Sequence, residues 1–133
     1  MKRRMLDTNI CIYIIKNKPL QVLRRFKEFD PGDLALSSIT VAELTYGAYK
    51  SAQRERNLKA LEDFLYPFDI VEFDADDARI YGEIRAALEK RGQVIGGLDM
   101  LIAACAMAND MILVTNNTRE FQRIEGLVIE NWV

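Results

Sequence analysis

Histidine is absent from this 133-residue chain. Because histidine is the commonest general base at neutral pH and a frequent zinc ligand, its absence excludes Ser-His and Cys-His catalytic pairs and most zinc sites. Cysteine occurs only as Cys11 and Cys105, each inside an apolar, helix-like stretch, so we expect two buried thiols rather than a disulfide. Any chemistry must therefore depend on carboxylates, amides, hydroxyls, lysine or a hard metal ion.

Long apolar runs are also missing. No stretch reaches the roughly 18 residues that a membrane-spanning helix requires. The basic residues 2–4 are followed so closely by Asp7 that the start does not resemble a signal peptide. We therefore expect a cytoplasmic protein with no membrane association. A formal net charge of −2 excludes the strongly basic surface of a typical DNA-binding domain, so nucleic acid would have to bind through a local patch or a metal ion.

The chain has only three prolines, no internal repeat and no long linker, which predicts one domain over residues 1–133. Five short apolar runs have the length of buried strands. They end at Leu6, Ser37, Phe73, Val114 and Ile129. Apolar residues recur at helical spacing in residues 20–26, 58–65, 78–88 and 98–108. Alternating strands and helices predict an α/β fold whose mainly parallel sheet is covered by helices on both faces.

Polar residues follow the apolar runs, at the edge where parallel α/β sheets place their sites. Asp7 ends the first run in MLDTN, and Asn116 and Asn117 end the fourth in LVTNN. Each also has an ordinary structural explanation. Asp7 or Thr8 is suited to capping a helix that starts near Asn9, and the two asparagines are suited to a turn.

Two further acids stand at predicted helix starts. Glu43 lies in SSITVAEL, where Thr40 and Glu43 match the S/T-x-x-E capping box. Asp99 lies in GGLDMLIAACAMA, in the first turn of the most apolar helix, where a cap or the helix dipole alone would favour an acid. The preceding Gly96 and Gly97 allow close backbone approach or a positive φ, which suits a helix start that faces a ligand.

The shared location of these acids favours one site over three separate caps. Strand ends and the first turns of crossover helices converge on one edge of the sheet, so Asp7, Glu43 and Asp99 would lie near the asparagine pair. Three close carboxylates repel one another and destabilise the fold unless a cation neutralises them. Without histidine, the simplest partner is a hard ion with oxygen ligands, Mg²⁺ or Mn²⁺.

Four blocks of the sequence resemble the PIN domain, and more closely the VapC ribonuclease toxins of bacterial toxin–antitoxin pairs. The blocks are MLDTNICIYIIKNKP, SSITVAELTYGA, IGGLDMLIAACA and LVTNNTREFQRIEGLVIENW, and together they span nearly the whole chain. The resemblance implies a single PIN domain with a three-layer α/β/α sandwich. It also implies a metal-dependent endoribonuclease whose metal-binding acids are Asp7, Glu43 and Asp99.

One position departs from the family pattern. Where many PIN domains carry a fourth acid, this chain has Asn117, preceded by Asn116. An amide supplies no charge, so we hypothesise that one ion is held tightly and that a second is recruited only with RNA. Glu120, three residues further on, would partly replace the missing acid.

The implied mechanism is hydrolysis by a metal-activated water. Asp7 and Asp99 would ligate the metal, and Glu43 would be a third ligand or would accept the proton of the water. The amides of Asn116 and Asn117 would orient water or a phosphate oxygen. A site without histidine lacks the acid–base pair that activates an RNA 2′-OH, so the products should carry 5′-phosphate and 3′-OH ends.

Supporting and substrate-binding roles fall on hydroxyl and basic side chains. Thr8 and Thr115 would hold the carboxylates through hydrogen bonds. The candidate RNA contacts are Lys16, Lys18, Arg119 and Arg123, although such residues are more often ordinary solvated charge. The basic residues of 54–59 are interpreted as a helix surface. The resemblance further implies a structured RNA substrate such as a tRNA, a homodimer, and a cognate VapB-like antitoxin whose C-terminal segment fills the groove and presents an arginine to the acids.

Two other functions remain open on the sequence alone. A phosphohydrolase of the haloacid dehalogenase type also begins with a strand ending in Asp, but it needs a second Asp two positions later, where this chain has Asn9. A catalytically silent PIN-like binding module would have lost turnover together with the fourth acid. The three acids that are present argue against the silent module.

Overall fold

A five-stranded parallel sheet forms the centre of the molecule, which a computed structural model describes over residues 2–133. The strand order is β3-β2-β1-β4-β5. The strands are β1 (Arg4–Leu6), β2 (Leu34–Ser37), β3 (Asp69–Val71), β4 (Ile112–Val114) and β5 (Ile129–Glu130). Every neighbouring pair is parallel, which confirms the predicted sheet.

The third strand ends two residues earlier than the sequence predicted. Phe73, the predicted end, lies beyond β3, where its N–H donates to the Ser38 hydroxyl at 3.2 Å. Asp74 then caps the next helix by accepting from two backbone N–H groups. These contacts turn the chain away from β2, so the pairing of β3 with β2 ends at Val71.

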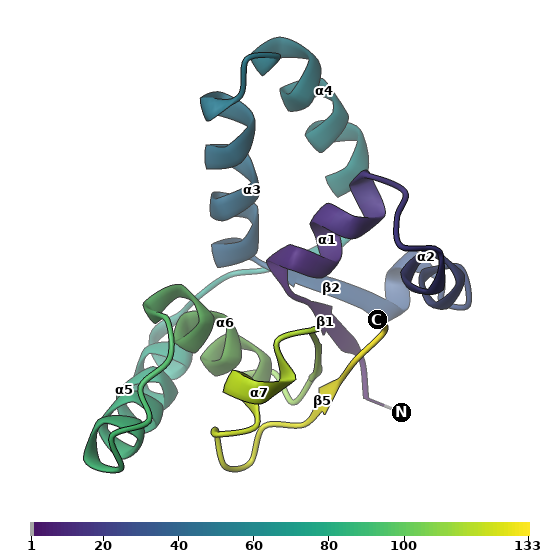
Figure 1. Cartoon of the computed structure of the whole chain (residues 1–133). Helices are drawn as coiled ribbons and strands as arrows, with labels where there is room; N and C mark the ends of the chain where they lie inside the picture. Colours follow the sequence, from purple (N-terminus) through teal and green to yellow (C-terminus); the bar gives the residue numbers. More distant parts are fainter. Residues whose placement is uncertain (1) are drawn as a thin grey trace.

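Helices cover both faces of the sheet and complete the predicted three-layer sandwich (Figure 1). They are α1 (Thr8–Ile15), α2 (Leu20–Phe26), α3 (Ser38–Lys50), α4 (Arg54–Leu65), α5 (Ala75–Lys90), α6 (Gly97–Ala108) and the short α7 (Thr118–Phe121), with a 3₁₀ turn at Pro31–Asp33. In Figure 1, α3 and α4 form a hairpin that stands out from the sheet, while α5 and α6 lie on the other side. None of the helices in residues 2–133 is both long and apolar enough to cross a bilayer.

Alternation along the strands divides the interior into two cores. Met5 and Leu113 face one core, which α5 and α6 cover, whereas Leu6 and Val114 face the other, which α1 to α4 cover. Successive strand residues point to opposite faces of a sheet, so each strand contributes to both layers. The two cysteines are buried and unpaired, one in α1 and one in α6, as predicted.

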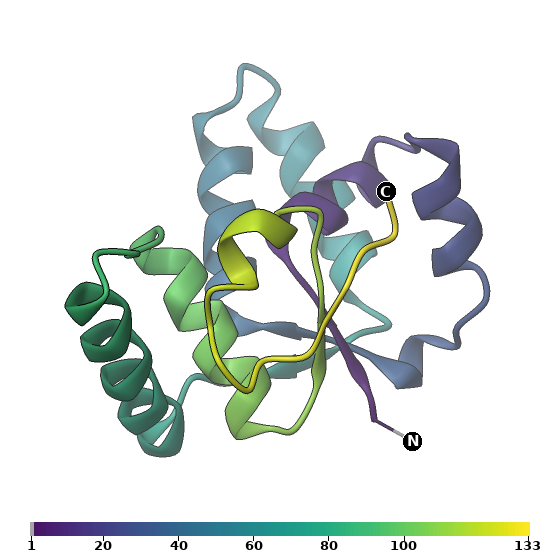
Figure 2. The ribbon, with the colours of Figure 1, turned by 60° about the horizontal axis from the view of Figure 1, so that its bottom comes forward.

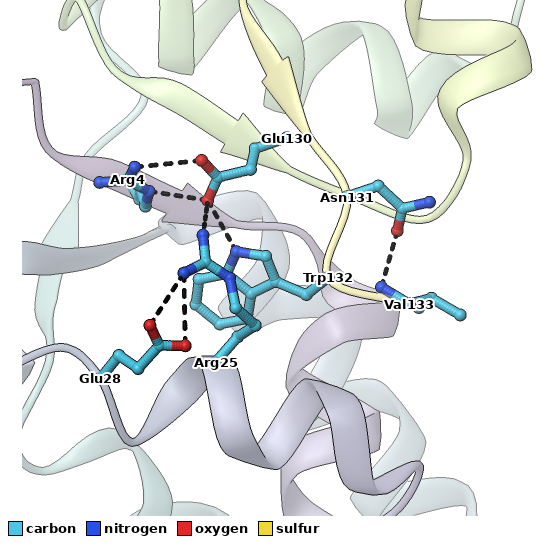
Figure 3. A network of polar contacts seen from close by, with 7 residues as sticks. All are labelled: Arg4, Arg25, Glu28, Glu130, Asn131, Trp132 and Val133. Carbon is cyan, nitrogen blue, oxygen red and sulfur yellow. Dashed lines mark hydrogen bonds and ion pairs between the residues drawn. The ribbon is translucent and has the colours of Figure 1, made fainter.

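The end of the chain is fastened to α2 by a network of polar contacts (Figure 3). The Arg4 guanidinium donates to both carboxylate oxygens of Glu130, at 2.8 and 3.0 Å. Arg25 of α2 and the Trp132 indole donate to the same carboxylate at 3.3 and 2.7 Å. The Trp132 ring also stacks on Phe29 with centroids 5.5 Å apart. The segment after β5 therefore runs back to end beside α2 (Figure 2).

Candidate metal-binding active site

Asp7 stands at the carboxyl end of the central strand β1, where the strand order changes direction. It is the N-cap of α1, and its carboxylate accepts from the Ile10 N–H at 2.9 Å. The capping explanation is thus confirmed for this residue. Asp7 is only 5% exposed, however, and no cation approaches it within residues 2–133, so capping leaves its buried charge unneutralised.

Glu43 is not part of a capping box. The N-cap of α3 is Ser37, whose hydroxyl accepts from the Thr40 N–H at 3.0 Å, so Thr40 lies inside the helix and Glu43 lies beyond its first turn. The Glu43 carboxylate instead accepts from the Thr8 hydroxyl at 2.6 Å. This bond ties α3 to the start of α1 and turns Glu43 toward the end of β1.

Asp99 lies in the first turn of α6, and the N-cap there is Gly96, so Asp99 itself does not cap the helix. Of the two possibilities that the glycine pair allowed, a positive φ is not adopted, since Gly96 has φ −55° and Gly97 is already helical. The Gly96 backbone lies beside the Asp99 carboxylate, where a Cβ would make an ordinary contact at 3.6 Å.

The three acids influence one another electrostatically. The pKa of Asp7 is raised to about 6, chiefly by burial and in part by the charges of Asp99 and Glu43, against hydrogen bonds from Thr115 and Ile10 that lower it. Burial and then the charges of Glu43 and Glu120 raise the pKa of Asp99. This environment penalises negative charge on the acids that the sequence singled out, as expected of a site that a cation completes.

The acids do not yet form a closed set of ligands. Within residues 2–133, no three acidic or cysteine side chains converge closely enough to grip a metal ion as they stand. Their carboxylate oxygens are nevertheless the donors that Mg²⁺ and Mn²⁺ prefer, so the donor set fits such an ion once Glu43 and Asp99 turn inward.

The segment after β4 adds the fourth part of the site. Thr115 is fully buried; its hydroxyl donates to Asp7 and accepts from the Asn117 N–H at 3.0 Å. Asn117 occupies the N-cap position of α7 without a capping hydrogen bond from its side chain, and its amide donates to Glu120 at 3.2 Å. The charge of Glu120 raises the pKa of Asp99, and its role as a substitute for the fourth acid stays a prediction.

Asn116 points to a different neighbour. Its amide nitrogen donates to the Tyr13 hydroxyl of α1 at 2.9 Å, and its buried amide oxygen has no partner within residues 2–133. Sequence reasoning missed the contacts of Tyr13 and of Thr40, whose hydroxyl oxygen lies 3.2 Å from that of Thr8. The helical periodicity of α1 and α3 gave no sign of these polar contacts between helices.

The four predicted RNA contacts are scattered. Lys16 and Lys18 are exposed near the end of α1, and Arg119 is exposed on α7. The Arg123 guanidinium is engaged by the backbone carbonyls of Gln93 and Val94, both at 3.4 Å. The RNA-binding role of these residues stays a prediction.

An open cavity of about 390 Å³ adjoins the acids between α1, α3 and α4. Its wall is mainly apolar and includes Ile12, Leu44 and Leu61. Glu43 and Lys16 are its charged lining residues. The cavity therefore joins an apolar surface to one edge of the acidic site.

Comparison with known proteins places this geometry in a family. The family model of the PIN domain matches residues 4–127. The chain is 50% identical to "Ribonuclease VapC2" of Haemophilus influenzae over 133 residues, and 48% identical to "tRNA(fMet)-specific endonuclease VapC" of Shigella flexneri over 132 residues. These alignments cover 100% of both chains in the first case and 99% of both in the second.

A crystal structure of DNA-bound VapBC from Salmonella typhimurium superposes with a TM-score of 0.93 at 44% identity, covering 100% of both chains. The relatives are thus similar to this chain in sequence, length and fold. With the PIN match, this shows that the chain belongs to the PIN-domain family, among the VapC ribonucleases of toxin–antitoxin systems.

Proposed function

We propose that this chain is the toxin of a VapB–VapC-type pair and that it is a Mg²⁺- or Mn²⁺-dependent endoribonuclease built on a single PIN domain over residues 1–133. The observation that carries the proposal is that Asp7 and Asp99 both have raised pKa values, caused first by burial and also by neighbouring acids that include Glu43. PIN-domain nucleases are typically metal-dependent, and a divalent ion would relieve this penalty.

Each side chain has a distinct task in hydrolysis. Asp7 and Asp99 would hold the ion, and Glu43, oriented by the Thr8 hydroxyl, would be a third ligand or would accept the proton of the attacking water. Thr115 holds Asp7, and Asn117 orients water or a phosphate oxygen beside Glu120. When bound, the ion supplies an acidified water and neutralises charge on the phosphate.

The proposed substrate is a structured RNA, and tRNA(fMet) is the first candidate. The relatives from Shigella flexneri and Salmonella typhimurium are both tRNA(fMet)-specific endonucleases, at 48% and 44% identity to this chain. Cleavage by water leaves 5′-phosphate and 3′-OH ends, because no histidine pair is present to activate the 2′-OH.

The apolar cavity between α1, α3 and α4 supports the proposed antitoxin partner. An amphipathic segment of a VapB-like protein would bury its apolar face there, and an arginine at its end would answer Glu43 and Asp7. We also propose a homodimer for the free toxin.

Expression without an antitoxin tests the enzymatic role. We expect wild type to arrest growth and to cleave tRNA(fMet) in Mg²⁺, and Asp7→Asn to lose more than about 100-fold in cleavage rate, since even residues that only support ligands cost 10- to 100-fold. Asparagine also caps helices, so α1 is preserved. Equal cleavage by both proteins would show that the site is wrong, and no cleavage by either would favour a silent binding module.

Metal stoichiometry tests the consequence of Asn117. We expect calorimetric titration with Mn²⁺ to show one tight ion in the free wild-type protein, and a second tight ion in Asn117→Asp, which restores the charge of a fourth acid. Two tight ions in the free wild type would contradict the single-ion hypothesis.

A further inference from the structure

One face of α3, which borders the cavity between α1, α3 and α4, forms a path from the acids toward the tip of the hairpin. Glu43 and Lys50 are seven residues apart on α3, so they lie on one face of the helix, separated by a rise of roughly 10 Å. Gly47 stands between them with open space around its Cα. Figure 1 shows this hairpin standing clear of the sheet, so its tip is accessible to a large ligand.

Two exposed tyrosines and two basic side chains gather at the far end of this path. The Lys50 ammonium lies 5.8 Å from the centre of the Tyr46 ring, and the Arg54 guanidinium lies 5.7 Å from the centre of the Tyr49 ring. The two tyrosines are 65% and 52% exposed, although aromatic rings usually bury most of their surface. We call these four residues the hairpin track.

The two cations of the hairpin track form no ion pair with an acidic residue among residues 2–133. Across residues 2–133, neither Lys50 nor Arg54 has a carboxylate within 4 Å. Lys59, on the same hairpin, pairs with Asp63 at 3.2 Å and is thereby neutralised. Acidic and basic residues are equal in number over residues 38–65, so the two cations of the track would act through their position beside the tyrosines and not through a net charge of the hairpin.

A polyanion with flat bases fits this arrangement. Cationic side chains neutralise phosphates, and exposed aromatic rings stack on bases regardless of their identity. A concave surface of about 590 Å³, lined by residues 51–56, continues the path at the hairpin turn. The acids act on only one phosphate of the substrate RNA at a time. The rest of the RNA must therefore lie outside the acidic site, where the track can contact it.

We propose that the hairpin track binds the backbone and bases of the substrate RNA about three nucleotides from the scissile phosphate, a distance set by the roughly 10 Å rise and about 3.4 Å per stacked nucleotide. This inference rests on the proposed ribonuclease function. The track determines RNA affinity and takes no part in bond cleavage.

The test compares two lysines at equivalent helical positions. Lys50 and Lys90 are each in the last turn of a helix, so replacing either by glutamine removes the same charge from the same local setting. Two substrates are used: tRNA(fMet), which can reach the track, and bis(p-nitrophenyl) phosphate, which occupies only the acidic site.

We expect the double variant Lys50→Gln/Arg54→Gln to raise the KM for tRNA(fMet) about tenfold, with kcat and turnover of bis(p-nitrophenyl) phosphate unchanged. The slope of log KM against log salt should fall by about 1.5, as two lost phosphate contacts require. Tyr46→Ala should raise KM about fivefold and Tyr46→Phe should not, since stacking needs only the ring. Lys90→Gln should stay within about twofold of wild type.

Three outcomes would overturn the inference. The first is a KM and salt slope in the double variant equal to those of Lys90→Gln. The second is a change from dimer to monomer in sedimentation that accounts for the rise in KM, because the face would then be a contact between copies. The third is equal affinity of wild type and double variant for tRNA(fMet) in filter binding. That binding assay also tests the track if wild type cleaves neither substrate, a result that would count against the proposed function and not against the track.

Discussion

Two acidic regions of this molecule handle buried negative charge in opposite ways. At the C-terminal network, Glu130 accepts from Arg4, Arg25 and the Trp132 indole, and these donors hold the pKa of Glu130 below its usual range. At the strand ends, Asp7 receives only neutral donors, and burial together with other acids raises its pKa to about 6.

The contrast separates a structural acid from a functional one. A carboxylate that arginines neutralise contributes to stability when it is ionised. A buried carboxylate that faces other carboxylates lowers stability when it is ionised. Asp7 is such a residue, and it lies at the edge of the sheet where functional sites form. Opposite effects of pH and of neutral substitution are therefore expected in the two regions.

The largest expected effect on stability is at Asp7. In protein without metal, we expect Asp7→Asn to raise the free energy of unfolding by about 2 to 3 kcal/mol at pH 8, as a raised pKa of this size implies. Because the folded-state pKa is above the unfolded value, ionisation destabilises the wild type as pH rises from about 4 through 6. The variant should lack this loss. Urea unfolding between pH 4 and 8 measures both, and a less stable variant at pH 8 would contradict the explanation.

The opposite sign is expected at Glu130. Its folded-state pKa is lowered, so its contribution is present above the unfolded value and is lost as pH falls below about 4.5. We expect Glu130→Gln to cost about 1 to 2 kcal/mol at pH 7 and little at pH 3. Glu28→Gln, which removes an exposed partner of the same Arg25, should cost under about 0.5 kcal/mol. An equal loss of unfolding free energy in Glu130→Gln and Glu28→Gln would show that the network contributes no more to stability than an exposed ion pair.

A smaller effect, on activity alone, is expected at Thr8. Its hydroxyl orients Glu43 through one hydrogen bond of 2.6 Å, and a single such bond contributes only about 1 kcal/mol to stability. We expect Thr8→Val to lower kcat on RNA about tenfold, as loss of a supporting hydrogen bond does, with the melting temperature nearly unchanged. Thr8→Ser, which keeps the hydroxyl, should retain activity. Full activity in Thr8→Val would mean that Glu43 needs no orientation.

The sequence predicted much of the acidic site at the strand ends but nothing of the C-terminal network around Glu130. Asp7 and Asp99 were found because the alternation of strands and helices determines where strand ends and helix starts meet. The capping box at Thr40 was misread because Ser37, one turn earlier, is the N-cap of the helix, and both Ser and Thr are favoured N-cap residues. The Glu130 network joins residues 126 and 105 positions apart in the chain, which no local periodicity reveals.

Crystals grown with Mn²⁺ and measured at its absorption edge test the central claim most directly. The account predicts an anomalous peak that the carboxylates of Asp7 and Asp99 contact, with Glu43 turned toward it, and no peak at Glu130. Side chains of residues 7, 43 and 99 that point to separate places, with no peak between them, would contradict it.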